Sequence, residues 1–298
     1  MPNASMSRRS TWTSLDLVRW TAGYFKDHRV ENARSEAEIL LAHTLGTRRI
    51  DLYLNHDQPL CEDELARFKS TIKRRLAGEP VAYITGVREF WSLTLTVNPS
   101  VLIPRPETEC LVEAVLPLLD DCAKSPKRVL EMGTGSGAIV IALAHDHPEH
   151  RYLAMDRSVA ALQTARQNAR KHRVEERIGW FCGNWDAALL PGNETFDLIV
   201  SNPPYIRSSD INELQPEIRN HEPRIALDGS ADGLACLRRI IESAHHYLRP
   251  GGHVALEMGY DQKTEIQSIA AAVGRYTSLR IVKDYSGHDR IALMTKMV

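Results

Sequence analysis

Apolar residues recur at helical spacing through the first part of the chain. One series repeats at intervals of three or four residues: Leu15, Val18, Ala22 and Phe25. A second series of the same kind follows over 37–45, and this spacing is typical of amphipathic helices. Gly46 and Gly78 stand where such helices commonly end. We therefore predict a small all-helical domain over residues 13–78, preceded by a disordered lead-in over 1–12.

The pattern changes to alternation in the next segment. The stretches 83–86 and 91–97 are rich in β-branched and aromatic residues, which favour strands. We predict that residues 79–100 form a β-hairpin linker. A helix over 106–119 should follow, because Pro106 suits the first turn of a helix.

From residue 101 to the end, short apolar runs alternate with helical patterns. The runs expected as strands are 129–130, 152–155, 180–182, 198–200 and 254–257, and the expected helices are 137–145, 158–172, 233–248 and 262–273. Such alternation is typical of a doubly wound α/β domain with a parallel sheet covered on both faces. The last two strands, 279–284 and 290–296, are joined by a turn too short for a helical crossover, so we expect this final pair to be antiparallel.

Composition and charge narrow the class of protein. The 298 residues are 43% hydrophobic and 25% charged, with a formal net charge of −1, so no global positive field attracts nucleic acid or membrane. No apolar run approaches the ~20 residues that span a bilayer. The five cysteines are widely spaced and form no C-x-x-C, which favours reduced thiols and argues against a zinc site. We expect a cytoplasmic monomer without a metal.

A glycine-rich loop follows the first expected strand of the α/β domain. It comprises Glu131, Gly133, Thr134, Gly135, Ser136 and Gly137, with Met132 inside it. Glycines are needed where the backbone turns tightly and a ligand approaches it. Asp156 ends the next strand, where a carboxylate can accept hydrogen bonds from both ribose hydroxyls. The spacing fits the E-x-G-x-G-x-G loop of S-adenosylmethionine enzymes. It also fits the G-x-G-x-x-A of nicotinamide dinucleotide enzymes, and a purely structural turn is a third interpretation.

Asn202-Pro203-Pro204-Tyr205 ends the strand expected at 198–200. Ligands of open α/β sheets bind at the carboxyl ends of the strands, so the tetrapeptide should lie beside the glycine loop. The Asn202 side-chain oxygen and the Pro203 carbonyl can accept the two N–H groups of a planar amide or amine. The prolines fix these acceptors, and Tyr205 offers a ring for stacking. A strand stop followed by a turn is the structural alternative.

Together these motifs resemble a known family. Asn-Pro-Pro-Tyr with the upstream glycine loop is similar to amino-methyltransferases that act on planar nitrogens. The stretch from Ile103 to Glu109 (IPRPETE), the hairpin and the helical N-terminal domain resemble the HemK-type release-factor glutamine methyltransferases over nearly the whole chain. The resemblance implies a class I methyltransferase fold. It also implies N5-methylation, by S-adenosylmethionine, of the glutamine in the Gly-Gly-Gln loop of class 1 translation release factors.

The resemblance also implies the site residues. The catalytic residues would be Asn202, Pro203, Pro204 and Tyr205, and the cofactor-binding residues Glu131, Gly133, Thr134, Gly135, Ser136, Gly137, Asp156, Trp185 and Asn202. In this assignment the glycine loop holds the methionine part of the cofactor, Asp156 binds its ribose and Trp185 lies near its adenine. Glu222-Pro223-Arg224, inside the long polar segment 207–232, is expected to border the substrate.

Two other functions remain as alternatives. The same tetrapeptide serves adenine-N6 methyltransferases of DNA or RNA. The N-terminal domain is close to neutral, however, and the residues after Tyr205 are all needed to complete the sheet, so we expect no base-reading domain and no nucleic-acid substrate. The other alternative is a non-catalytic binding module of the translation machinery. An intact Asn202 tetrapeptide argues against it, because binding alone requires no amide clamp.

Overall fold

The computed structural model describes residues 11–120, 125–192 and 195–298. They form two compact units, the first ending at Gly86 and the second beginning at Val87. The lead-in predicted over 1–12 lies outside the described residues except for its last two. Of these, Trp12 is buried among the apolar residues of the helical unit. Burial of the large apolar indole is favoured by the hydrophobic effect, so ordered packing begins before residue 13.

The first unit is helical, as predicted. Its helices are α1 (Ser14–Asp27), α2 (Ala33–Leu45), α3 (Asp51–Leu54), α4 (Glu62–Leu76) and α5 (Val81–Thr85). Helix α1 begins after Thr13, whose hydroxyl accepts a hydrogen bond from the Asp16 N–H. Helix α2 ends at Gly46, which adopts the left-handed conformation that glycine tolerates best. Leu17, Phe25 and Leu40 are fully buried in this unit's core.

Helix α5 replaces the strand that we predicted over 83–86. Pro80 precedes the helix and its carbonyl accepts from the N–H groups of Tyr83 and Ile84, and Gly86 ends it in the left-handed conformation. Ile84 is buried in the core of the helical unit. Tertiary burial and these two end signals outweigh the strand preference of a β-branched pair. This part of the hairpin prediction is wrong.

The hairpin is shorter than predicted and consists of β1 (Val87–Phe90) and β2 (Leu93–Thr96). Asn168 of α8 (Val159–Lys171) attaches it to the second unit. Its side-chain oxygen accepts from the Thr96 N–H at 2.7 Å, and its Nδ2 donates to the Thr96 carbonyl at 2.9 Å. Because Asn168 is fully buried, these bonds fix the hairpin as part of the second unit rather than as a free linker.

The second unit contains a seven-stranded sheet with the order β5-β4-β3-β6-β7-β9-β8. The strands are β3 (Arg128–Met132), β4 (Arg151–Asp156), β5 (Ile178–Cys182), β6 (Phe196–Ser201), β7 (Leu248–Glu257), β8 (Tyr276–Lys283) and β9 (Asp289–Lys296). The first five are parallel, whereas β9 is antiparallel to both β7 and β8. The predicted α/β fold with an antiparallel final pair is confirmed. So is the adjacency of β3 and β6, which end in the glycine loop and the tetrapeptide.

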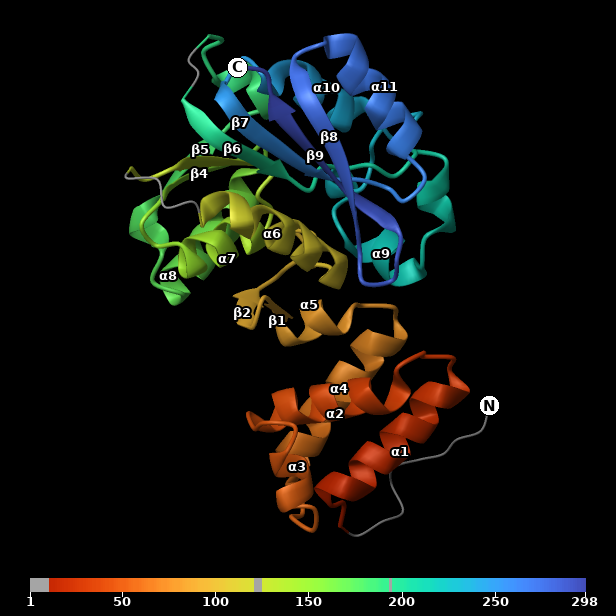
Figure 1. The fold of residues 1–298 in the computed structure, drawn as a ribbon. Coiled ribbons are helices and arrows are strands. Elements are labelled where there is room, and N and C mark those ends of the chain that lie inside the picture. Colours follow the sequence, from red (N-terminus) through yellow and green to blue (C-terminus); the bar gives the residue numbers. More distant parts are fainter. Residues whose placement is uncertain (1–10, 121–124, 193–194) are drawn as a thin grey trace. The chain divides into compact units, whose positions relative to one another are not determined.

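Helices cover both faces of this sheet (Figure 1). On one side lie α6 (Pro106–Leu119), α7 (Ala138–Asp146) and α8, and on the other α10 (Ala235–Ala244) and α11 (Lys263–Val273). Successive strand residues point to opposite faces of the sheet. Val129 therefore packs in the core on the side of α6 and α7, and Leu130 in the core on the side of α10 and α11. Between β6 and α10 lies α9 (Pro216–His221). With both faces covered, the carboxyl edge of the sheet is the natural place for a ligand.

Candidate active site

A pocket opens where β3, β4 and β6 end. The expected site residues that line it are Glu131, Gly133, Thr134, Gly135, Ser136, Asp156, Trp185, Asn202 and Pro204. The structure therefore brings the glycine loop, the acidic residue and the tetrapeptide to one place. Gly137, Pro203 and Tyr205 are not among the described residues that line this pocket.

The glycine loop is held against β4 by its own backbone. The N–H groups of Gly133 and Thr134 both donate to the Met155 carbonyl, each at 2.9 Å. Gly135 has a φ of +56°, in the left-handed region, and a Cβ added there would have no atom within 4 Å. The turn thus leaves open space beside the main chain, as a loop that receives a ligand requires.

Gly137 ends the loop and packs against two helices. Its φ is +83°, and a Cβ at this position would lie 2.8 Å from Ile141 Cδ1 and 3.1 Å from Ala165 Cβ. These two residues belong to α7 and α8. Gly137 is therefore required for the close packing of the loop against the two helices, and it does not form part of the pocket wall.

Two carboxyl groups with different surroundings flank the loop. Glu131 is 1% exposed and accepts from the Thr134 hydroxyl at 2.5 Å, and burial raises its pKa to about 8. Asp156 is half-buried and accepts from the N–H groups of Gly135 and Ser158, both at 2.9 Å. Each oxygen of Asp156 keeps a lone pair for a ligand hydroxyl. A carboxyl group with free lone pairs beside an open loop fits a cofactor with ribose hydroxyls.

Trp185 forms a flat wall of the pocket. Its ring atoms would lie 3.6 Å from a Cβ at Gly133, so the indole stands against the glycine loop. The residue is half-buried and has a φ of +54°, at the start of the short 3-10 helix Trp185–Ala188. An indole face of this kind offers stacking area to a planar ring.

The Asn202 side chain is held by a chain of hydrogen bonds. Its Nδ2 donates to Thr108 Oγ1 at 3.0 Å, and Thr108 Oγ1 donates to Glu257 Oε2 at 2.7 Å. The Tyr205 hydroxyl donates to the other Glu257 oxygen, Oε1, at 3.0 Å. Glu257 is 1% exposed, and burial raises its pKa. The Asn202 amide group is therefore fixed, with its nitrogen end already bound.

Sequence reasoning missed the partners of Asn202. Thr108 lies inside the IPRPETE stretch and Glu257 at the end of an apolar strand, and neither was assigned a role. A carboxylate that ends a buried strand at the ligand edge of the sheet was the available signal. The pairing itself links residues far apart in the chain, so no local pattern could reveal it.

The segment after the tetrapeptide is folded against the IPRPETE stretch. Glu222 is 6% exposed and accepts from Arg105 Nη2 at 2.5 Å and from the Ile103 N–H at 3.1 Å. Pro223 and Ile225, which follow it, line the pocket. The expectation that this segment borders the site is supported, and the ion pair between half-buried Arg105 and buried Glu222 holds the segment in place.

One other cluster has the composition of a metal site. The ring nitrogens of His147 and His150 lie within 4.8 Å of each other and of a Glu149 oxygen. His150 is already satisfied, because its Nδ1 accepts from the Lys127 N–H and its Nε2 donates to the Leu119 carbonyl. The cluster lies outside the pocket and is better explained by these structural contacts.

Comparison with known proteins identifies the family. The N-terminal residues 16–86 match the family model described as the PrmC N-terminal domain, and residues 109–218 match the methyltransferase small domain. The release factor glutamine methyltransferase of Geobacter sulfurreducens is 41% identical over 280 residues, which are 94% of this chain and 95% of that protein. Its counterpart in Burkholderia pseudomallei is 46% identical over 243 residues, 80% and 84% of the two chains.

The chain belongs to the release factor glutamine methyltransferase family. It is an enzyme, and S-adenosylmethionine is its methyl donor. The resemblance drawn from the motifs is confirmed, and the nicotinamide interpretation of the glycine loop is set aside. Among solved structures, a methyltransferase from Pyrococcus furiosus has a TM-score of 0.51 at 20% identity, covering 77% of this chain and 100% of that one. At this identity the similarity concerns the fold alone.

With Asp156 as the expected acceptor of the ribose hydroxyls, Asp156→Ala should weaken S-adenosylmethionine binding by about 1.5–3 kcal/mol, the range for hydrogen bonds to a charged group. Titration calorimetry gives the affinity directly. Asp197→Ala is a matched control, since Asp197 also accepts from a backbone N–H, that of Arg128 at 2.7 Å, but does not line the pocket. Equal affinity for wild type and Asp156→Ala would contradict the role of Asp156, and tight NADH binding would contradict the cofactor.

Proposed function

We propose that this enzyme methylates the side-chain amide nitrogen, N5, of the glutamine in the Gly-Gly-Gln motif of class 1 translation release factors. The observation that supports this most directly is the Asn202 carboxamide. Its nitrogen donates to the Thr108 hydroxyl oxygen, and Asn202 lines the same pocket as the glycine loop. An acceptor oxygen held in this way suits a substrate with an NH₂ group.

The amide nitrogen of glutamine is a poor nucleophile, because its lone pair is delocalised into the carbonyl. The enzyme must therefore orient the group. The Asn202 oxygen and the Pro203 carbonyl would accept its two N–H bonds and turn the lone pair toward the bound cofactor, S-adenosylmethionine, which supplies the methyl group. As the nitrogen gains positive charge, these two dipoles stabilise it without needing to reorient. Pro203 and Pro204 fix φ, which keeps both acceptors in place beforehand.

The cofactor roles follow the same proposal. Gly133 and Gly135 would leave room for the methionine part, and the carboxyl of Glu131 lies beneath this loop. Asp156 would accept from the ribose hydroxyls, and Trp185 would pack against the adenine. Support for these assignments is the shared pocket and the free lone pairs of Asp156.

The function is tested by radiolabelled methyl transfer from S-adenosylmethionine to a purified class 1 release factor. Duplex DNA and RNA serve as the alternative acceptors. Label on the Gly-Gly-Gln glutamine supports the proposal, with the position read by mass spectrometry. Label on adenine instead would establish the adenine-N6 alternative, and no transfer to any acceptor would favour a binding module.

We propose further that the helical domain, predicted over 13–78, recognises the body of the release factor. Two apolar side chains one helical turn apart are exposed on this unit, Ile50 at 54% and Leu54 at 67%. Remote contacts of this kind position a substrate without taking part in the chemistry. The family model that matches this region, the PrmC N-terminal domain, supports a family-specific role.

Ile50→Glu and Leu54→Glu should each lower kcat/KM on a whole release factor by about tenfold or more, the effect typical of a hot-spot residue in an interface. Transfer to a short Gly-Gly-Gln peptide should change little, because the peptide lacks the remote surface. Val159→Glu, at a side chain 58% exposed on the second unit, is the control. Equal losses on both substrates would refute this division of labour.

We propose a cytoplasmic location from two findings. Among the described residues, no helix combines the length and apolar character that crossing a membrane requires. Four cysteines, Cys61, Cys110, Cys182 and Cys236, are free thiols. A cytoplasmic enzyme, acting where release factors are made, agrees with both findings. That it is a monomer stays a prediction.

A further inference from the structure

A carboxamide has two different ends, and only one of them suits the proposed reaction. If the oxygen of Asn202 faces the substrate, it accepts an N–H bond. If the group is turned by half a rotation, its NH₂ faces the substrate NH₂ and neither can accept. The enzyme therefore needs a device that decides between two orientations of nearly identical shape.

Thr108 supplies this device, because a hydroxyl has a single proton. That proton is directed to Glu257 Oε2, with an oxygen–oxygen distance of 2.7 Å. Only lone pairs of Thr108 then remain for Asn202, 3.0 Å away, so Thr108 can accept from Asn202 but cannot donate to it. The NH₂ end of Asn202 must point to Thr108, which leaves the oxygen end for the pocket.

In its ionised form Glu257 sets the direction of the whole chain of hydrogen bonds, because a carboxylate only accepts. Its two oxygens receive the hydroxyl protons of Thr108 and Tyr205. Burial raises the pKa of Glu257, and Glu107 of α6 adds to this. The hydroxyls of Thr108 and Tyr205 and the positive charge of Arg290 of β9 oppose it, so the carboxylate form depends on these three groups.

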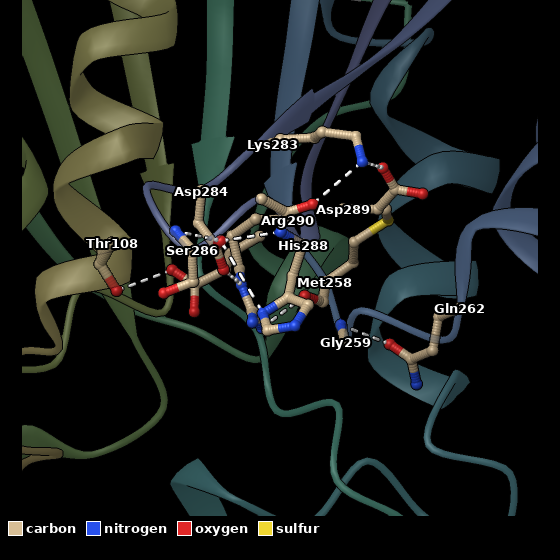
Figure 2. A network of polar contacts seen from close by, with 12 residues as sticks. Thr108, Met258, Gly259, Gln262, Lys283, Asp284, Ser286, His288, Asp289 and Arg290 are labelled. Carbon is tan, nitrogen blue, oxygen red and sulfur yellow. Dashed lines mark hydrogen bonds and ion pairs between the residues drawn. The ribbon is translucent and has the colours of Figure 1, made fainter.

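The β8–β9 turn holds Arg290 in position (Figure 2). Asp284, whose side chain is 2% exposed, accepts from Arg290 Nε at 3.1 Å and from the N–H groups of Ser286 and His288 at 3.0 Å. Arg290 Nη1 donates to the carbonyl of Met258, the residue after Glu257, at 3.2 Å. A fixed positive charge thus lies close to the carboxylate.

We infer that Glu257 and Thr108 are positioning residues that set the orientation of the Asn202 carboxamide and thereby the preference of the pocket for an amide over a carboxylate. This inference rests on the proposed function. Thr108 lines the pocket and Glu257 does not, and the role of each is to act through Asn202. We call the hydrogen bonds from Asn202 to Thr108 and from Thr108 to Glu257 the relay. Without them, Asn202 can turn its NH₂ toward the pocket, where it would pair with an acceptor such as a glutamate oxygen.

The test compares Thr108→Val, which keeps the shape and removes the hydroxyl, with Thr108→Ser, which keeps the hydroxyl. The probes are release factors with glutamine or glutamate at the target position, and the readouts are kcat, KM, cofactor affinity and the binding preference for glutamine over glutamate. Thr108→Val should lower kcat by roughly 10–100-fold and reduce the binding preference by about tenfold or more, with cofactor affinity unchanged. Thr108→Ser should recover both to within about threefold of wild type.

Glu257→Leu connects the effect to the carboxylate. It should reduce the glutamine preference as Thr108→Val does, and the double variant should show no further loss, because both changes break one relay. An unchanged preference in either single variant that still binds cofactor, or an equal loss in Thr108→Ser, would overturn the inference. If the wild type fails to methylate any release factor, the proposed function is wrong. An active wild type with unaffected variants rejects only the relay.

Discussion

A release factor with glutamate in place of the target glutamine should be methylated at least about 10⁴-fold more slowly than the normal substrate. In the proposed clamp the Asn202 oxygen and the Pro203 carbonyl would both accept hydrogen bonds, so the substrate should need two N–H donors. Glutamate brings only acceptors and a negative charge against these two dipoles. A site built around such bonds is left with unpaired polar groups, which makes the rejection strong.

Single-turnover assays on release factors changed at that one position measure this directly. Asparagine is the informative control, since it keeps the NH₂ but is one methylene shorter. The resulting displacement of the nitrogen by about 1 Å should cost roughly 10²-fold. The expected order is glutamine, then asparagine, then glutamate without detectable product. Methylation of asparagine as fast as glutamine would show that the clamp does not select its substrate.

Asn202→Ala should lower turnover by roughly 10²–10³-fold, the effect of losing one preorganised contact to a developing charge. Cofactor affinity should change little, because the Asp156 carboxylate and the glycine loop remain. Asn184→Ala is the matched control: Asn184 also lines the pocket, but no hydrogen bond joins its side chain to Thr108 in the described residues. At saturating cofactor its single-turnover rate should equal that of wild type. Full activity of Asn202→Ala would refute the proposed mechanism.

The sheet could be predicted from the sequence because its signals are local. Alternation of apolar runs with helical patterns predicts parallel strands, and the short connection between the last two strands permits only an antiparallel pair. The meeting of the glycine loop and Asn202 followed from the same logic, since parallel strands end at one edge. Strands β3 and β6 are neighbours in the sheet, so the loop and the tetrapeptide that follow them lie side by side.

The rest depends on contacts that local patterns do not encode. Thr108 and Glu257 are 149 positions apart, and only the packing of α6 against the end of β7 brings them together. Gly137 looked like its neighbours in the loop, yet its need for glycine comes from Ile141 and Ala165 on two helices. Helix α5 was mistaken for a strand because β-branched residues favour strands, whereas the burial of Ile84 in the helical core favours the helix.

The attachment of the hairpin by Asn168 has a consequence for how the chain folds as it leaves the ribosome. The helical unit ends at Gly86 and has its own core, so it can fold while synthesis continues. The hairpin emerges next, but an isolated two-stranded hairpin is marginally stable. Its anchor at Thr96 lies 72 positions before Asn168. Residues 87–96 should therefore stay unfolded until α8 has been synthesised. A nascent chain stalled before that point would carry a folded helical unit and an unfolded catalytic unit.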